Sequence, residues 1–284
     1  MKTQKWIKLT VLTLLSGVLL ISCQKEEAFT PETIVSADFT VRPDFATLDT
    51  RPASVIADFT FTAEDAVAVK LDGNAAKGLK YALVIGISDY EGTANDLTYC
   101  DEDADDWGAR LQTEGYTVTM LKDLNATQSA IESAVATLAS QAIAGNEISL
   151  VYSGHGSRGS IVTTDLAYIS STWFGTSFSN ATSTKMMFTF DACQIGAMKT
   201  DLSATGRIVT VASDTRRYSY DGDATMANGV FTYYQMEGFD TENYIYVEDD
   251  SQYACDEMYA WAASLHGVKV APSYDDSYAG DFDL

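Results

Sequence analysis

One thiol and one imidazole in this sequence directly follow apolar segments that are typical of buried strands. His155 stands between two glycines just after residues 147–152, and Cys193 comes soon after residues 186–190. A thiolate attacks a carbonyl carbon well, and a neighbouring imidazole can take the thiol proton and later protonate a leaving amine. The pattern therefore predicts acyl-transfer chemistry, with Cys193 as nucleophile and His155 as its proton-transfer partner.

The backbone around these two residues also favours this chemistry. Glycines let the chain turn sharply and approach a substrate closely, and the amides of Gly156 and Cys193 are predicted to bind the oxyanion. Losing one such donor raises an acyl-transfer barrier by about 3 kcal/mol. The alternative is a structural role, since single Cys and His residues are commonly buried and inert. A structural role is our interpretation of His266, the other histidine of the chain.

Alternating strands and helices are expected to position the two residues. Apolar runs predict strands at 81–87, 117–121, 147–152, 186–190 and 207–212, and helical spacing predicts helices over 101–111, from 127 to about 145, and over 249–265. This alternation implies right-handed crossovers and a mainly parallel sheet covered on both faces. Ligand chemistry in such sheets lies at the carboxyl ends of the strands, where His155 and Cys193 fall.

The N-terminus has the pattern of a secretory signal. Three lysines precede an apolar stretch over 9–21, which is too short to count as a membrane-spanning helix, and Cys23 follows it. The end of this stretch resembles the lipobox of bacterial lipoproteins, which implies cleavage before Cys23 and lipid attachment to it. We expect a bacterial outer-membrane lipoprotein, periplasmic or surface-exposed, with membrane contact through the lipid only. The alternative is a secreted protein without lipid.

Three segments are predicted along the chain. Residues 1–22 form the lipoprotein signal peptide, residues 23–78 a lipidated tether, and residues 79–284 the domain that carries the dyad. The tether holds three of the four prolines, and its repeated Ala-Asp-Phe-Thr at 37–40 and 57–60 suggests two short strands that pack as a hairpin on the domain.

The formal charge limits the classes of partner. It is −22 for the whole chain, and loss of a signal with three lysines and no acids takes it to −25. This charge repels phosphate backbones and favours cationic ligands, so nucleic acid is not an expected partner. An acidic surface that serves only solubility is the alternative. We expect a monomer.

The cysteines leave two arrangements open. Cys23 is assigned to lipid, and three further cysteines remain in a protein that is expected in an oxidising compartment. Either Cys100 and Cys255 form a disulfide, which leaves Cys193 free, or all three are unpaired.

Five ordered blocks of the sequence resemble the caspase-like peptidase domain, peptidase C14, in particular its metacaspase and clostripain-like relatives. The blocks are residues 82–87, 99–104, 152–157, 191–193 and 229–234. The resemblance covers somewhat more than half of the chain. It implies a caspase-like three-layer α/β/α sandwich with a mainly parallel sheet, and hydrolysis of peptide bonds by a His155/Cys193 dyad.

The resemblance also bears on specificity. Metacaspase-like sequences place two acids in the pocket for the residue before the scissile bond, and the matching positions here are Asp103 and Asp191. Two carboxylates favour Arg or Lys through charge-assisted hydrogen bonds. Asp214, after the fifth strand, is expected to assist substrate binding. The alternative for Asp103 is a role at a helix start. Gln194 stands where the family usually has a His.

The predicted function is therefore a cysteine endopeptidase that cleaves protein or peptide substrates after Arg or Lys. Basic residues at Lys199 and at 216–217 are candidate self-processing or inhibitory sequences. No metal motif is present and no cofactor is expected, while activation by calcium stays open. One alternative is a catalytically silent surface-binding lipoprotein, with the cleft blocked by Ile195 or by residues 213–221. Another alternative is peptide-bond transfer.

Overall fold

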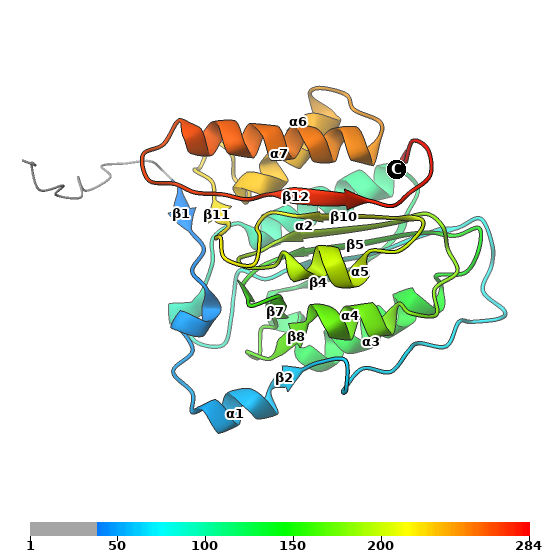
Figure 1. Cartoon of the computed structure of the whole chain (residues 1–284), viewed down its shortest axis with the longest axis horizontal. Coiled ribbons are helices and arrows are strands. Elements are labelled where there is room, and N and C mark those ends of the chain that lie inside the picture. The colour runs from blue at the N-terminus through cyan, green and yellow to red at the C-terminus, as the bar shows by residue number, and fades with distance from the viewer. Residues whose placement is uncertain (1–38) are drawn as a thin grey trace, which may run out of the picture. The chain divides into compact units, whose positions relative to one another are not determined.

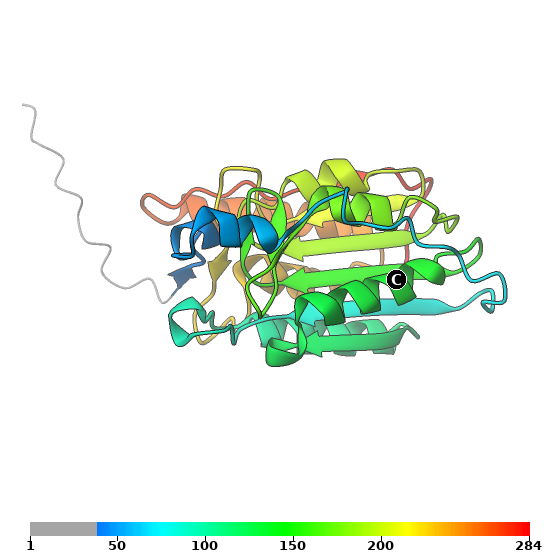
Figure 2. The same cartoon turned by 90° about the horizontal axis from the view of Figure 1, so that it is seen from below.

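The computed structural model describes residues 39–284, and a six-stranded sheet lies at their centre. In spatial order its strands are β12 (Ser273–Asp276), β10 (Arg207–Val211), β9 (Met186–Asp191), β5 (Glu147–Ser153), β3 (Lys80–Gly86) and β4 (Thr117–Lys122). All neighbours are parallel except β12, which runs antiparallel to β10 (Figures 1 and 2). The predicted fold class is confirmed, and no predicted strand differs from the observed one by more than one residue at either end.

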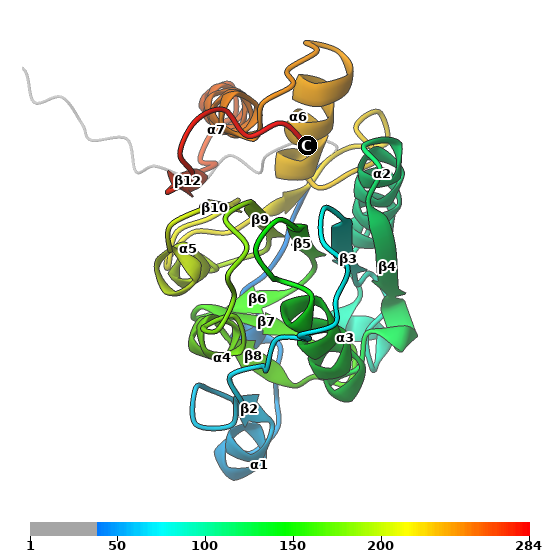
Figure 3. The ribbon, with the colours of Figure 1, turned by 90° about the vertical axis from the view of Figure 1, so that its right-hand side faces the viewer.

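Helices cover both faces of this sheet, as Figure 3 shows. Alternation along β3 sends Leu83 and Ile85 into one core and Ala82 and Val84 into the other. The first core is closed by α3 (Gln128–Ser140), α4 (Ser171–Ser177) and α5 (Ala197–Leu202). The opposite face is covered by α2 (Cys100–Thr113), α6 (Val230–Asp240) and α7 (Val247–Ala263).

Three predicted helices are confirmed as α2, α3 and α7, with shifted ends. The third begins and ends two residues earlier than predicted, at Val247 and Ala263. The helix predicted to end near residue 145 stops at Ser140, because the chain turns there and the backbone N–H of Gln141 bonds back to Leu138. Within residues 39–284, no helix is long and apolar enough to cross a lipid bilayer.

The segment predicted as a tether contributes to two small sheets from its first described residues onward. β1 (Thr40–Val41) pairs antiparallel with β11 (Tyr220–Asp221), and β2 (Thr60–Phe61) joins β8 (Tyr168–Ser170), β7 (Ser160–Val162) and β6 (Gly156–Ser157). Between them lie the 3-10 turn η1 (Phe45–Thr47) and α1 (Ala53–Asp58). Two short strands thus follow the two Ala-Asp-Phe repeats, but the hairpin prediction is wrong because they enter different sheets.

The signal peptide over residues 1–22 and lipid attachment at Cys23 lie outside the described residues. They stay predictions.

Candidate active site

The two predicted reactive residues leave the same edge of the sheet. β5 and β9 are parallel neighbours with Ser153 paired to Asp191, and each reactive residue follows shortly after the end of its strand. The Gly154 amide donates to the Asp191 carbonyl at 3.2 Å, which joins the two loops just beyond the paired strands. The strand-end argument from the sequence therefore matches the observed topology.

The imidazole of His155 is held by a backbone carbonyl. Its Nε2 lies 2.7 Å from the carbonyl oxygen of Asn95, and a carbonyl can only accept, so in the neutral ring Nε2 carries the proton. Nδ1 is then the basic nitrogen, and it has no hydrogen-bond partner among residues 39–284. The ring of Tyr90 lies 4.7 Å away between centroids. Burial lowers the pKa of His155 to about 4, so the ring is neutral near pH 7.

The thiol of Cys193 is fully buried and contacts two backbone groups. Sγ donates to the carbonyl oxygen of Arg42 at 2.8 Å and accepts from the amide of Ser219 at 3.1 Å. Burial raises the pKa of this thiol to about 12, against the opposing effect of the Ser219 hydrogen bond. The group is therefore a neutral thiol in this arrangement and not the reactive thiolate.

This protonation state has a measurable consequence. We expect iodoacetamide to modify Cys193 of the folded wild-type protein slowly at pH 7.5, with a rate that rises about tenfold per pH unit through pH 10, because only the thiolate reacts. Peptide mapping by mass spectrometry would follow Cys193 separately from Cys100 and Cys255, and urea-unfolded protein is the control for full reactivity. A rate that levels off near pH 7 would contradict the assignment of a neutral thiol.

A guanidinium surrounded by acids lies beside this thiol. The side chain of Arg42 contacts Asp103 at 3.1 Å, Asp191 at 3.2 Å and Asp221 at 2.7 Å, and all four side chains are at most 2% exposed. A Cβ on Gly229 would collide with Arg42 Nη2 and with Asp191 Oδ2. Glycine at this position therefore leaves the space that the guanidinium occupies.

Each of the three carboxylates is also held by protein donors. These donors are Ser153 Oγ and the Gly229 amide for Asp103, Ser219 Oγ and the amide and hydroxyl of Thr232 for Asp191, and the Thr98 amide for Asp221. Arg42 Nη1 further donates to the carbonyl of Asp191 at 2.8 Å and to Ser153 Oγ at 3.1 Å. The acids are thus positioned by the protein and do not depend on Arg42 alone for hydrogen bonds.

The charges in this cluster shift one another's pKa values. Burial alone lowers the pKa of Arg42, but Asp191, Asp221 and Asp103 outweigh it and raise that pKa well above its usual value. Burial, with Asp191 nearby, raises the pKa of Asp103 to about 7 despite the opposing charge of Arg42. The arrangement is therefore a cluster of buried carboxylates around a permanently charged cation.

The sequence that forms this site identifies the protein family. Residues 79–261, which include both predicted reactive residues, match the caspase domain family, peptidase C14. The chain belongs to the caspase domain family.

The solved structures that share its fold include the following two. A protein from Geobacter sulfurreducens is 15% identical, with a TM-score of 0.56, over 72% of this chain and 97% of that chain. Caspase-1 from Spodoptera frugiperda is 14% identical, with a TM-score of 0.56, over 76% of this chain and 95% of that chain. At these identities the likeness shows the fold alone. No curated protein sequence matches the chain.

One acid that the sequence predicts to assist substrate binding, Asp214, lies apart from the cluster around Arg42. Asp214 does not contact Arg42; its carboxylate accepts the amides of Arg216 and Arg217 at 2.7 Å and so shapes its own loop. Asp221, for which the sequence predicts no binding role, is the third acid that contacts the guanidinium. Asp103 lies in the first turn of α2, as the helix-start alternative predicts, and its buried carboxylate also contacts Arg42 and the Gly229 amide.

Arg42 was missed because it lies in the segment predicted as a tether. The sequence around it gives only a weak signal: Arg42 follows the β-branched pair Thr40-Val41, which favours a short strand, and precedes Pro43. The basic residues that the sequence analysis did single out lie elsewhere. Arg216 is exposed, and Lys199 donates to Ser273 Oγ at 2.9 Å.

Residues next to the dyad have structural partners of their own. A Cβ on Gly156 would collide with the carbonyl of Cys193, so glycine is required there, while the oxyanion role of the two amides stays a prediction. Gln194 Nε2 donates to Asp44 at 3.0 Å. Ile195 is fully buried in the core that α3, α4 and α5 close.

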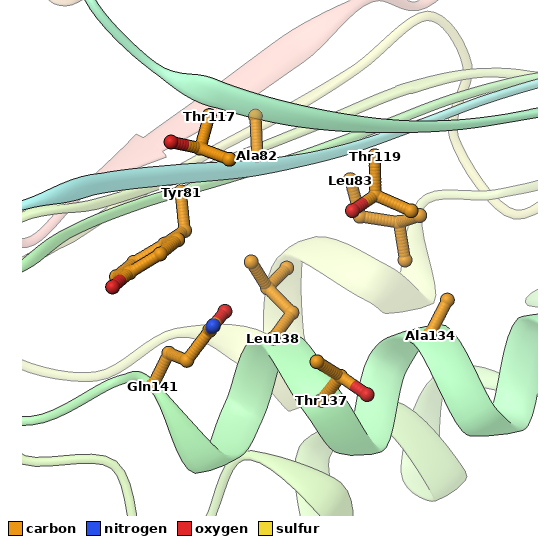
Figure 4. Close-up of a pocket in the computed structure, with 9 residues that line it drawn as sticks. All are labelled: Tyr81, Ala82, Leu83, Thr117, Thr119, Ala134, Thr137, Leu138 and Gln141. Atoms are coloured by element: carbon orange, nitrogen blue, oxygen red, sulfur yellow. The ribbon is translucent and has the colours of Figure 1, made fainter. Parts of the chain in front are cut away.

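Other features of residues 39–284 do not add to the site. Cys100, Cys193 and Cys255 are free buried thiols, so the disulfide alternative is not observed. No group of His, Cys, Asp and Glu side chains within this range is arranged to hold a metal ion. A cavity of about 140 Å³ between α3 and the edge of the sheet, drawn in Figure 4, is lined by aliphatic, hydroxyl and amide side chains and lacks a nucleophile–base pair.

Proposed function

We propose that this protein is a cysteine endopeptidase that hydrolyses peptide bonds after Arg or Lys, with Cys193 and His155 as its catalytic residues. One observation carries the proposal. The guanidinium of Arg42 lies among three buried carboxylates while the carbonyl oxygen of the same residue lies 2.8 Å from the Cys193 thiol. A substrate arginine in this pocket would present its own carbonyl to the same thiol.

The proposed mechanism uses the free nitrogen of the imidazole. His155 Nδ1 takes the proton of the Cys193 thiol, and the thiolate attacks the carbonyl carbon of the substrate arginine. The amides of Gly156 and Cys193 bind the oxyanion, and His155 then gives the proton to the leaving amine. Water, deprotonated by His155, then attacks the thioester, the carbon–sulfur bond breaks, and the new carboxyl product leaves while Cys193 regains its proton from His155. The backbone carbonyl of Asn95 keeps the ring in the tautomer that these steps need.

The pocket favours arginine over other side chains by its geometry. Arg42 contacts acids on three sides through Nε, Nη1 and Nη2. A lysine carries its charge on a single ammonium group, which would contact fewer of these carboxylates. A substrate aspartate would bring a further negative charge among carboxylates and is excluded. We expect cleavage after Arg to exceed cleavage after Lys.

The setting of the enzyme is part of the proposal. Its partners are protein or peptide substrates with basic residues, and nucleic acid is not among them. The lipid on Cys23 would attach a monomeric enzyme to the bacterial outer membrane, on the periplasmic or the outer side. No cofactor is needed for the steps above, and an assay with and without calcium would decide whether calcium activates them.

A panel of fluorogenic peptides tests this function. We expect a protein with the pocket vacated by Arg42→Ala to cleave after Arg, more slowly after Lys, and not measurably after Asp or Leu. In that background, Asp191→Asn should lower kcat/KM for the Arg peptide, since breaking a buried charge pair costs about 2–5 kcal/mol. That cost corresponds to a loss of roughly 30- to 5,000-fold.

The matched control is Asp214→Asn, the same change at the acid that lies outside the pocket. It should leave kcat/KM for the Arg peptide within about twofold. No cleavage of any basic peptide would remove the proposal and favour the silent binding lipoprotein. Equal losses in the two variants would remove the pocket assignment, and products joined to an added amine would indicate peptide-bond transfer.

A further inference from the structure

Residues 39–48 lie in the active site as a bound peptide would. β1 runs antiparallel to β11, with Val41 opposite Tyr220, and the amide of Arg42 donates to the carbonyl of Ser219 at 3.0 Å (Figure 1). Addition of an extended strand to a sheet edge is a common way for proteins to bind peptides. The backbone of this segment therefore has the direction and the hydrogen bonds of a strand-forming ligand.

Side chains along the segment anchor it on both sides of the thiol. Before Arg42, the ring of Phe39 lies 5.1 Å from Trp261 and 5.9 Å from Tyr220, between centroids. After it, Phe45 is fully buried, with its ring 5.1 Å from that of His155. A solvated tether has no reason to bury one aromatic ring and a guanidinium fully and a second ring, that of Phe39, in part.

The same contacts close the reactive groups off from solvent. Cys193 is 0% exposed and His155 is 1% exposed. The carbonyl oxygen of Arg42 accepts a hydrogen bond from the thiol, and the buried ring of Phe45 packs against the imidazole. An incoming substrate would find the acids around Arg42, the strand β11 and the dyad all occupied.

We propose, on the basis of the peptidase function above, that residues 39–48 form an intramolecular pseudosubstrate that inhibits the enzyme until it is displaced. Arg42 takes the place of the substrate residue before the scissile bond. Phe39 fills the aromatic site that Tyr220 and Trp261 form, three residues upstream of Arg42. The regulated site is thus the substrate cleft itself.

Pro43 explains why the segment inhibits and is not cut. Cleavage of the bond after Arg42 would release the nitrogen of Pro43. This nitrogen bears a ring carbon in place of a hydrogen, and the ring carbon hinders its protonation by an imidazole. In the resting protein the thiol donates its proton to the carbonyl oxygen of Arg42. The proline therefore opposes release of the leaving nitrogen after attack, so the bond after Arg42 stays intact.

Peptidase activity of the full mature chain tests this inhibition. We expect Arg42→Ala to raise the initial rate on an Arg fluorogenic peptide at least tenfold over wild type. The matched control is Arg51→Ala, which removes an arginine from the same stretch of chain that pairs with Asp49 outside the pocket. Its rate should equal that of the wild type within about twofold.

A second variant guards against misfolding of the first. Phe39→Ala leaves the buried ion pairs intact and removes only the upstream aromatic anchor, so it should raise the wild-type rate several-fold. Labelling of Cys193 by an arginyl chloromethyl ketone should rise in the same order across the variants. Circular dichroism and thermal denaturation would establish that each variant is folded.

The outcomes separate the two proposals. If wild type, Arg42→Ala and Phe39→Ala cleave the Arg peptide at equal rates, the pseudosubstrate proposal is wrong and the peptidase proposal stands. If no folded variant cleaves the peptide or takes up the label, the peptidase proposal is wrong and the inhibition falls with it. If Arg51→Ala raises the rate as much as Arg42→Ala does, Arg42 has no specific role in the inhibition.

Discussion

Replacement of Cys193 by alanine is expected to abolish hydrolysis of Arg peptides, with kcat/KM lowered on the order of 10⁴-fold or more in the Arg42→Ala background. The reason is chemical, since the carbonyl oxygen of Arg42, whose place a substrate arginine would take, lies 2.8 Å from Sγ, and the proposed attack needs this sulfur. His155→Ala should lose activity to a similar extent, because members of a catalytic unit act together and their effects are not additive. Initial rates over a range of peptide concentrations would measure both losses.

The chain offers a matched control for each substitution. Cys255→Ala makes the same change at another buried thiol, on α7, and His266→Ala changes the other histidine. Both should keep kcat/KM within about threefold of the parent. Full activity in folded Cys193→Ala would show that the proposed mechanism is wrong. Full activity in His155→Ala would show that another group transfers the proton.

The sheet and the dyad could be predicted because their signals are local. Each central strand is an apolar run of five to seven residues, and its register in a parallel sheet places the following loop at a known edge. His155 and Cys193 are found from this rule alone. The short strand β12 escaped prediction because its sequence, Ser-Tyr-Asp-Asp, has none of the apolar character of a central strand.

The pocket could be predicted only in part because it is assembled from distant segments. Asp103 and Asp191 belong to motifs that resemble those of known peptidases, whereas Asp221 lies on a two-residue strand whose partner is β1. Arg42 is separated from Asp221 by 179 residues of chain. A contact of that kind arises from tertiary packing, which no spacing rule in a single sequence records.

The buried charges show why a covering segment can fit this site. Asp103, Asp191 and Asp221 would repel one another in a dry pocket, and burial of an unpaired charge is costly. Arg42 supplies the cation that lets the pocket close without water, and an arriving substrate arginine would do the same. A substrate arginine and Arg42 would therefore make the same contacts with the acids. Which of them binds would depend on the other contacts of residues 39–48, such as those of Phe39 and Phe45.

Pro43→Ala is expected to turn the pseudosubstrate into a substrate. The new Arg–Ala bond after Arg42 would have an N–H and a leaving nitrogen that His155 can protonate, while Arg42 stays in its pocket. We expect essentially all of the protein to be cut between residues 42 and 43, whereas the wild type stays intact at this bond. Mass spectrometry of the purified chain measures the cut.

Pro52→Ala is a stringent control for this self-cleavage, because it also creates an Arg–Ala bond. Arg51 pairs with Asp49 and with the carbonyl of Leu166, away from Cys193, so the new bond should stay intact in the folded protein. The double variant Pro43→Ala with Cys193→Ala should also stay intact. An uncut Pro43→Ala protein that still cleaves Arg peptides would show that Arg42 blocks the cleft without lying in a reactive geometry. Cleavage in both single proline variants would show that the enzyme cuts accessible Arg–Ala bonds between molecules, so that position in the pocket does not select the bond.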